Sequence, residues 1–136
     1  GGLDADTPVR ILDTRFGIGL VGAGPGSPPA GALGPQQVVD VHVAGQGGVP
    51  NNGVSAVVLN VTVVAPTAKG WLTLWPDGTM PTASNLNFVA GQTVPNLVIV
   101  ALGPGGTVRV GNTIGCGCAG FTHVVLDVVG WFADTP

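Results

Sequence analysis

The chain has very little charge. Only 8% of its 136 residues are Asp, Glu, Lys or Arg, against about 25% in an average soluble domain. There is no Glu and no Tyr, and the four positive side chains are Arg10, Arg15, Lys69 and Arg109, which leaves a net charge of −3. Nucleic-acid binding draws much of its affinity from many Lys and Arg side chains that neutralise phosphates. The composition therefore predicts that nucleic acid is not a partner.

Long hydrophobic runs are also missing. A membrane-spanning helix needs about 18 or more consecutive apolar residues, and Gly and Pro interrupt every Val-rich run before that length. We therefore expect no membrane span. Scarce charge with a Gly, Thr, Asn and Val bias is typical of a secreted or cell-surface protein, or of a subunit whose faces are covered by neighbours. The chain begins Gly1-Gly2-Leu3 without an initiator Met, so we expect a processed mature protein or an excised domain.

Only two cysteines are present, Cys116 and Cys118, with one residue between them. An even count in a secreted chain suggests a disulfide, but this spacing closes a small, strained ring. Four alternatives stay open: a local disulfide, two free thiols, bonds to a neighbouring chain, and a soft-metal site. Two thiolates would leave a zinc ion half-coordinated, with His123 as the one further ligand nearby in sequence. We name Cys116 and Cys118 as a candidate disulfide, and we expect no metal and no cofactor.

Helical patterning is absent as well. With 24 Gly and 12 Pro, no window keeps apolar residues at helical spacing, whereas apolar and polar residues alternate in many short runs. Turn-forming stretches separate these runs, and one of them, Gly103-Pro104-Gly105-Gly106, predicts a hairpin loop. We predict an all-β fold, an antiparallel β-sandwich or barrel of about 8–10 short strands. Residues 1–136 are expected to form a single β-rich module, in which the Gly/Pro-rich residues 17–35 form an extended loop.

Four strand-like stretches each carry one Asp or Asn among aliphatic residues. A carboxylate in apolar surroundings is costly unless it is paired or hydrogen-bonded. If these strands are neighbours, the oxygens can gather around Arg10 or Arg15, because a guanidinium can bond two carboxylates at once. Calcium ligation and acid–base catalysis by the same oxygens are the alternatives. The predicted structural polar network consists of Arg10, Asp13, Arg15, Asp40, Asn60 and Asp127.

Two tryptophans form a second constellation. Trp71 and Trp75 lie four residues apart on one expected strand, so they point to the same face about 13 Å apart. Two indoles at this spacing can stack on alternate sugars of an extended polysaccharide; the alternative is that this face is the core of the second sheet. Trp131 is expected to share a face with Asp127 and to extend either the platform or the core. The candidate ligand-binding residues are Trp71, Thr73, Trp75, Asn85, Asn87 and Trp131.

An ordered series of motifs runs along nearly the whole chain. Its members are Pro8-Val9-Arg10-Ile11-Leu12-Asp13-Thr14-Arg15, Gly47-Gly48-Val49-Pro50, Val57-Val58-Leu59-Asn60-Val61-Thr62, Gly70-Trp71-Leu72-Thr73-Leu74-Trp75-Pro76, Ser84-Asn85-Leu86-Asn87-Phe88, Pro95-Asn96-Leu97-Val98 and Val125-Leu126-Asp127-Val128-Val129-Gly130-Trp131-Phe132. This series resembles a domain common in secreted and cell-surface proteins of actinobacteria, which opens with P-x-R-L-L-D-T-R. The resemblance implies a β-rich accessory module, appended to secreted hydrolases or repeated on surface proteins, with no settled activity. The Cys-Gly-Cys segment departs from the family's usual short polar turn.

No residues spell out a reaction. His42 and His123 have no Ser or Cys partner at a telling spacing, so a nucleophilic triad is not supported and we expect no enzyme. We predict a non-catalytic extracellular module that binds a polysaccharide or cell-wall glycan through surface tryptophans. The alternative is a self-assembling structural subunit of an extracellular filament, layer or oligomer, because scarce charge leaves little repulsion between copies. Exposed indoles would favour the first function, and buried indoles with apolar patches elsewhere would favour the second.

Overall fold

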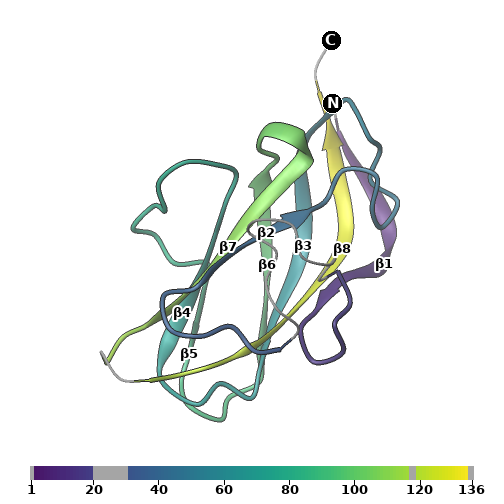
Figure 1. Cartoon of the computed structure of the whole chain (residues 1–136). Coiled ribbons are helices and arrows are strands. Elements are labelled where there is room, and N and C mark those ends of the chain that lie inside the picture. Colours follow the sequence, from purple (N-terminus) through teal and green to yellow (C-terminus); the bar gives the residue numbers. More distant parts are fainter. Residues whose placement is uncertain (1, 20–30, 117–118, 135–136) are drawn as a thin grey trace.

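The computed structural model describes residues 2–19, 31–116 and 119–134, and in these residues the chain forms eight strands and one short 3-10 turn. The strands are β1 (Leu3–Asp13), β2 (Val38–His42), β3 (Val54–Val64), β4 (Gly70–Trp75), β5 (Leu86–Phe88), β6 (Val94–Ala101), β7 (Thr107–Ile114) and β8 (His123–Ala133). Two four-stranded antiparallel sheets, ordered β1-β8-β3-β6 and β2-β7-β4-β5, pack face to face (Figure 1). The predicted all-β fold is confirmed, and it is a sandwich, not a closed barrel.

Alternation along the strands places one face of each sheet in the core. On β3 the residues Val57, Leu59, Val61 and Val63 are fully buried, while Asn60 and Thr62 between them face outward. Fully burying a Val or Leu side chain contributes roughly 1.5–3 kcal/mol, so the two inner faces together hold the sheets in contact. The matching inner residues of the other strands include Leu72, Leu74, Val108, Val110, Val124, Leu126 and Val128.

One irregularity in β8 changes the face on which its last residues lie. Leu59 of β3 is opposite Val128, but the next pair toward the end of β8 is Val58 with Gly130, so Val129 is an extra residue. Such a bulge shifts the period-two alternation by one position. Trp131 is therefore opposite the buried Val57 and packs against the core. The expectation that Trp131 shares a face with Asp127 is wrong, because the bulge lies between them.

The connection after β6 also differs from expectation. Residues Pro104–Gly106 form the short 3-10 turn, but β6 before it and β7 after it belong to different sheets. The predicted hairpin is thus a crossover between the two layers, visible at the top of Figure 1. The Gly–Pro signal marks a reversal of the chain correctly, but it does not specify which strands pair.

Parts of two further predictions fall outside the described residues. Of the expected loop over residues 17–35, positions 20–30 are not described; at its ends Ile18 bridges to Asp13, and Leu33 bridges to Thr122. Cys116 is disulfide-bonded and so is not a free thiol, whereas Cys118 lies outside the described residues. In the part of the chain that is described, no helix has the length and apolarity of a membrane span.

Candidate functional site

The candidate site lies on the outer face of the β2-β7-β4-β5 sheet. Because Leu72 and Leu74 point into the core, the alternate residues Trp71, Thr73 and Trp75 of β4 point away from it. The register places Trp71 between Thr113 of β7 and Asn87 of β5. Three strands therefore contribute one outward side chain each to a row across this sheet.

Trp75 is covered, although it faces outward. Its side chain is only 4% exposed, and the indole Nε1 donates a hydrogen bond to the Gly78 carbonyl at 3.0 Å. The chain after β4 folds back over the sheet, and the Thr73 hydroxyl donates to the Ala83 carbonyl of the same connection at 3.1 Å. Trp75 also packs over Gly111, where a Cβ atom would stand 3.1 Å from the ring. The predicted pair of surface tryptophans is therefore wrong for Trp75.

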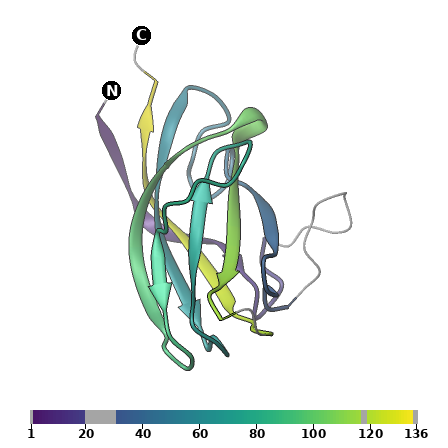
Figure 2. The same ribbon diagram turned by 90° about the vertical axis from the view of Figure 1, so that its left-hand side faces the viewer.

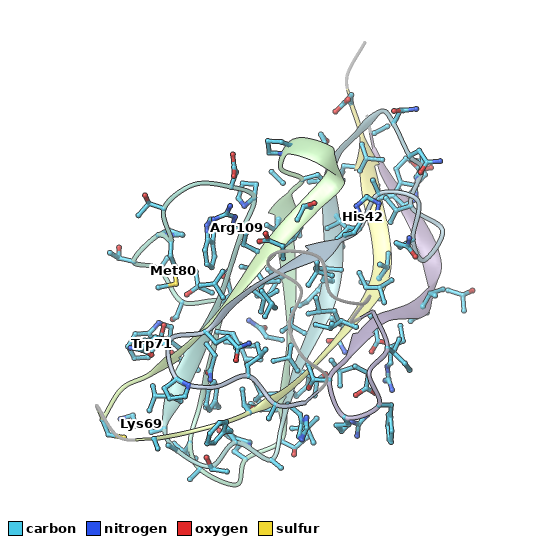
Figure 3. All side chains as sticks on the ribbon, viewed as in Figure 1. His42, Lys69, Trp71, Met80 and Arg109 are labelled. Carbon is cyan, nitrogen blue, oxygen red and sulfur yellow. The ribbon has the colours of Figure 1, made fainter. Side chains whose placement is uncertain are left out.

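Trp71, by contrast, is partly exposed and forms one wall of an open pocket. The pocket has a volume of about 260 Å³ and is lined by Lys69, Gly70, Trp71, Asn87, Phe88, Val89 and Gln92. The benzo edge of the indole lies beside Gly115, where an added Cβ would meet it at 3.4 Å. This edge of the ring therefore lies close to Gly115, and the Trp71 side chain is labelled in Figure 3.

The pocket combines an aromatic wall with polar groups. Asn87 is exposed and faces outward, and Lys69 is exposed at the start of β4 with no ion-pair partner among the described residues. The Gln92 Oε1 accepts a hydrogen bond from the Val89 amide at 3.2 Å, so its NH₂ group is the part that remains for a ligand. Pockets of this kind fix a ligand by an apolar surface and a few polar groups.

A second, smaller hollow lies on the same outer face. It has a volume of about 90 Å³ and is lined by Gln36, Gln37, Val38, Met80, Gly111, Asn112 and Thr113. Since Thr113 is the cross-strand neighbour of Trp71, the two hollows lie on either side of this pair. Figure 3 shows Met80 and Trp71 projecting on the same side of the ribbon.

Other predicted binding residues serve the fold. Asn85 accepts a hydrogen bond from the Leu74 amide through its Oδ1 at 2.7 Å, and its backbone carbonyl accepts from the Asn96 side chain. This arrangement fastens the connection to β4 and leaves Asn85 half-buried. Thr73 is buried and Trp131 packs on the core. Of the six predicted binding residues, Trp71 and Asn87 line a pocket. The sequence analysis did not identify the lining residues Lys69, Gln92 and Met80, because single side chains in turns have no periodic pattern.

The predicted polar network exists in part, on the outer face of the other sheet. Arg10 bonds Asp127 through Nε at 3.0 Å and Asp13 through Nη1 at 3.3 Å. Arg15 donates to Asp13 from its backbone N, Nε and Nη2 at 3.1, 3.0 and 2.9 Å. Asp13 is 0% exposed, so these donors replace the water that it has lost.

The protonation of the network follows from these bonds. Hydrogen bonds from Arg15 hold the pKa of the Asp13 carboxyl below its ordinary value, against the opposing effect of burial. The hydrogen bond with Asp127 raises the pKa of Arg10, and the one with Asp13 raises the pKa of Arg15. The cluster is thus held by charge-assisted hydrogen bonds, and those from Arg15 favour the ionised form of Asp13.

Two members of the predicted network do not join it. Asp40 lies on β2 in the other sheet, where its partner is Arg109 at 3.5 Å; Arg109 also meets Asp77 at 3.7 Å. The prediction that Asp40 lies in one cluster with Arg10 is wrong, because β2 and β1 belong to different sheets. Asn60 is directly opposite Asp127 in the β3–β8 register, but within the described residues its side chain makes no hydrogen bond.

No group of three His, Cys, Asp or Glu side chains in the described part of the chain is placed to hold a metal ion. His123 is engaged otherwise, with its Nδ1 2.9 Å from the Thr14 hydroxyl. No family model, curated protein or solved structure matches this chain. The site therefore has to be interpreted from its own geometry.

Proposed function

We propose that the chain is a non-catalytic extracellular module that binds a polysaccharide or cell-wall glycan at Trp71. The observation that carries this proposal is the partly exposed Trp71 indole, which forms one wall of the 260 Å³ pocket. An aromatic ring offers a flat apolar surface with a polarised π-face, and this surface suits the C–H groups on one face of a pyranose ring. A pocket lined by an aromatic side chain and a few polar groups is typical of a small-ligand site.

The polar groups around the pocket suit sugar hydroxyls. Asn87 supplies both a donor and an acceptor, and the Gln92 amide and Lys69 supply donors. A ligand stacked on Trp71 would reach Asn87 on the neighbouring strand, because the two residues are directly opposite in the β4–β5 register. Neutral amides with one cation favour a neutral or anionic glycan over a cationic ligand.

The neighbouring hollow extends the candidate binding site across the strands. The Trp71–Thr113 pair separates the larger pocket from the smaller hollow at Gln36, Met80 and Thr113. A chain of sugars crossing the strands could therefore place successive units in the two hollows. This single-tryptophan site replaces the two-indole platform, because Trp75 is covered by the connection after β4.

The resemblance to secreted actinobacterial accessory modules supports the same assignment. Such a module would bring an attached enzyme or surface protein to an insoluble glycan, so we propose a secreted or cell-surface location. The module itself contributes affinity only, and we propose that it is no enzyme.

The test is retention on insoluble polysaccharides, including purified cell walls, cellulose, xylan and chitin. We expect the wild-type chain to be retained on at least one, and Trp71→Ala to lose retention at least tenfold. Phe16→Ala is the matched control, because Phe16 is an exposed aromatic that stacks on Arg15 outside the site. Equal retention of both variants, or no retention of the wild-type chain on any glycan, would overturn the proposal.

A further inference from the structure

Among the residues that the structure describes, the sandwich has four edge strands, and three of them are protected. A sheet edge presents unpaired N–H and C=O groups, which natural proteins shield by charges, prolines, bulges or short length. β1 has two register shifts and carries Arg10 and Pro8. β2 has five residues and carries Asp40, and β5 has only three residues. Each of these edges is therefore a poor template for another strand.

The fourth edge, β6, lacks most of this protection. It has eight residues and pairs with β3 in one unbroken register from Val63–Val94 to Ala56–Ala101. No charged residue occurs anywhere from Gly78 to Val108. Figure 2 shows β6 in green as a long strand along one side of the molecule. Its outward-facing side chains Leu97 and Ile99 are 59% and 62% exposed.

The hydrogen-bond pattern shows which backbone groups of β6 are free. The Leu102 amide donates to the Ser55 carbonyl at 3.3 Å, and these two residues continue the β3–β6 register. Because antiparallel pairs alternate, Val98 and Val100 turn their backbone groups toward β3. The backbone N–H and C=O groups of Leu97, Ile99 and Ala101 point toward the open edge. The Pro95 carbonyl points the same way.

Pro95 limits this edge without closing it. Its missing N–H would have pointed to the open side, where proline is tolerated in an edge strand. A partner strand can therefore receive no donor from Pro95, but it can still use the Pro95 carbonyl. Any pairing that is centred on Leu97 to Ile99 keeps the defect at the end of the ladder.

We propose that β6 pairs with the β6 of a second copy of this chain, antiparallel, across a two-fold axis at Val98. In this register Leu97 is opposite the partner subunit's Ile99, and Pro95 is opposite the partner subunit's Ala101. Each Leu97–Ile99 pair then exchanges two backbone hydrogen bonds, and each Ala101 N–H donates to a Pro95 carbonyl. The two four-stranded sheets join into one continuous sheet.

Side chains add a second contribution to the pairing. Leu97 and Ile99 lie on the outer face, so the two-fold axis brings four exposed aliphatic side chains together on that face. Cross-strand aliphatic pairs of this kind stabilise the pairing of two strands. The burial of exposed apolar surface is the larger gain, because these side chains face water in the single chain.

The charge distribution favours a second copy over an unrelated strand. On the outer face of this sheet the nearest charged residue to Leu97 is Asp127, which lies two strands away beyond Asn60. Two copies therefore meet along a neutral edge, although each carries a net charge of −3. The edge has no charge that would select an oppositely charged partner. A second β6 suits it, because the Ala101 N–H of one copy can bond the Pro95 carbonyl of the other and no donor is needed from Pro95.

The proposed assembly is a closed dimer with a modest interface. A two-fold axis uses β6 of both copies, so no open edge of this kind remains for a filament. One strand pair and four aliphatic side chains fall below the area of about 800 Å² per partner that is typical of stable complexes. The dimer should therefore form in a concentration-dependent way, in the range of about 1 μM to 1 mM.

The test is sedimentation equilibrium of the wild-type chain over this concentration range, with and without reductant. We expect a monomer–dimer equilibrium that reductant does not abolish, and at least a tenfold weaker association for Leu97→Lys and for Ile99→Lys. Leu3→Lys is the matched control, because Leu3 is an exposed aliphatic residue on β1, at the opposite edge of the same sheet. A wild-type chain that stays monomeric, or equal association of all variants, would overturn the proposal.

Amide hydrogen exchange locates the contact even where a variant fails to fold. In the wild-type chain the Leu97, Ile99 and Ala101 amides should exchange at least tenfold more slowly as the concentration rises. The Val98 and Val100 amides, which are bonded to β3, should be protected at all concentrations. Concentration-dependent protection at β1 or β5 instead would show a different interface. Trp71 lies on the other sheet, so glycan retention by the monomeric lysine variants tests the proposed function separately.

Discussion

Arg10 and Asp13 share one face of β1, with Arg10 Nη1 3.3 Å from Asp13 Oδ2. In a regular strand, two residues three positions apart would lie on opposite faces. The reason is a second bulge. Arg10 is opposite Asp127 and Leu12 is opposite Leu126, so Ile11 is an extra residue between them. The bulge thus gathers the carboxylates of β1 and β8 around one guanidinium, and Ile11 is still buried toward the core.

Acid should weaken the fold through Asp13. Its pKa is lower in the folded chain than the ordinary value of about 3.9. Its contribution is therefore fully present above about pH 5 and is lost as the pH falls through 4 and then through the folded pKa. We expect Asp13→Asn to lower the free energy of unfolding by about 2 kcal/mol at pH 7. Thermal unfolding between pH 7 and pH 2 should show the two curves converging in acid; a constant difference would contradict this.

Trp75 should matter more for stability than Trp71. Replacing the buried Trp75 by Ala leaves a cavity under the connection after β4, at a cost of about 3–5 kcal/mol. It also removes the shorter of two hydrogen bonds to the Gly78 carbonyl, which accepts from Arg109 Nη1 as well. Trp71→Ala removes a half-exposed ring and should cost about 1 kcal/mol. Urea unfolding of the two variants provides the comparison. Equal midpoints would show that the connection does not hold Trp75 as described.

Two glycines near Trp71 should respond differently to a methyl group. A Cβ on Gly70 would overlap the Thr113 carbonyl oxygen of the neighbouring strand, whereas a Cβ on Gly115 would only touch the Trp71 ring at 3.4 Å. We expect Gly70→Ala to cost about 1–3 kcal/mol, as overpacking does, and Gly115→Ala to change stability by less than about 0.5 kcal/mol. Melting temperatures of the two purified variants test this. A tolerated Gly70→Ala would mean that β4 and β7 can separate locally.

Asn112 should be needed for the segment that leads into β2. Its Nδ2 donates to the Leu33 and Gly34 carbonyls at 3.1 and 3.0 Å, and Leu33 is fully buried. Asn112→Ala removes one of the two donors to each carbonyl, because the Leu33 oxygen also accepts from the Thr122 amide and the Gly34 oxygen from the Gln37 amide. The loss of the two side-chain bonds should cost about 1–2 kcal/mol. Thr113→Ala is the control, because Thr113 faces outward on the same strand. Amide exchange of Leu33 and Thr122, which bond each other, should accelerate in Asn112→Ala and stay unchanged in the control.

The strand faces were predictable from the sequence because they depend on local alternation. Val57, Leu59 and Val61 alternate along β3 and share one buried face, and Trp71 and Trp75 both point outward from β4. What alternation cannot show is whether another segment covers an outward face. The burial of Trp75 depends on the path of residues 76–85, which is decided by contacts such as the bond from Thr73 to Ala83.

Strand neighbours were also beyond the sequence pattern. Asp40 and Asp127 stand in similar apolar surroundings, yet they lie in different sheets. Their separation follows from the order in which the strands pair, and that order depends on contacts distant in sequence. The sequence does not indicate the bulge at Val129 either, because Val128, Val129 and Gly130 are all compatible with a regular strand.

That extra residue makes β8 a strand with two phases. In residues 123–128 the even-numbered side chains face the core, whereas in residues 130–133 the odd-numbered side chains do, and each half keeps its own register with β3. A one-residue insertion or deletion within either half would exchange inside and outside for the residues beyond it, and would bring Trp131 to the surface or an outward residue into the core. We therefore expect variation in β8 to consist of substitutions, with changes of length confined to the connections.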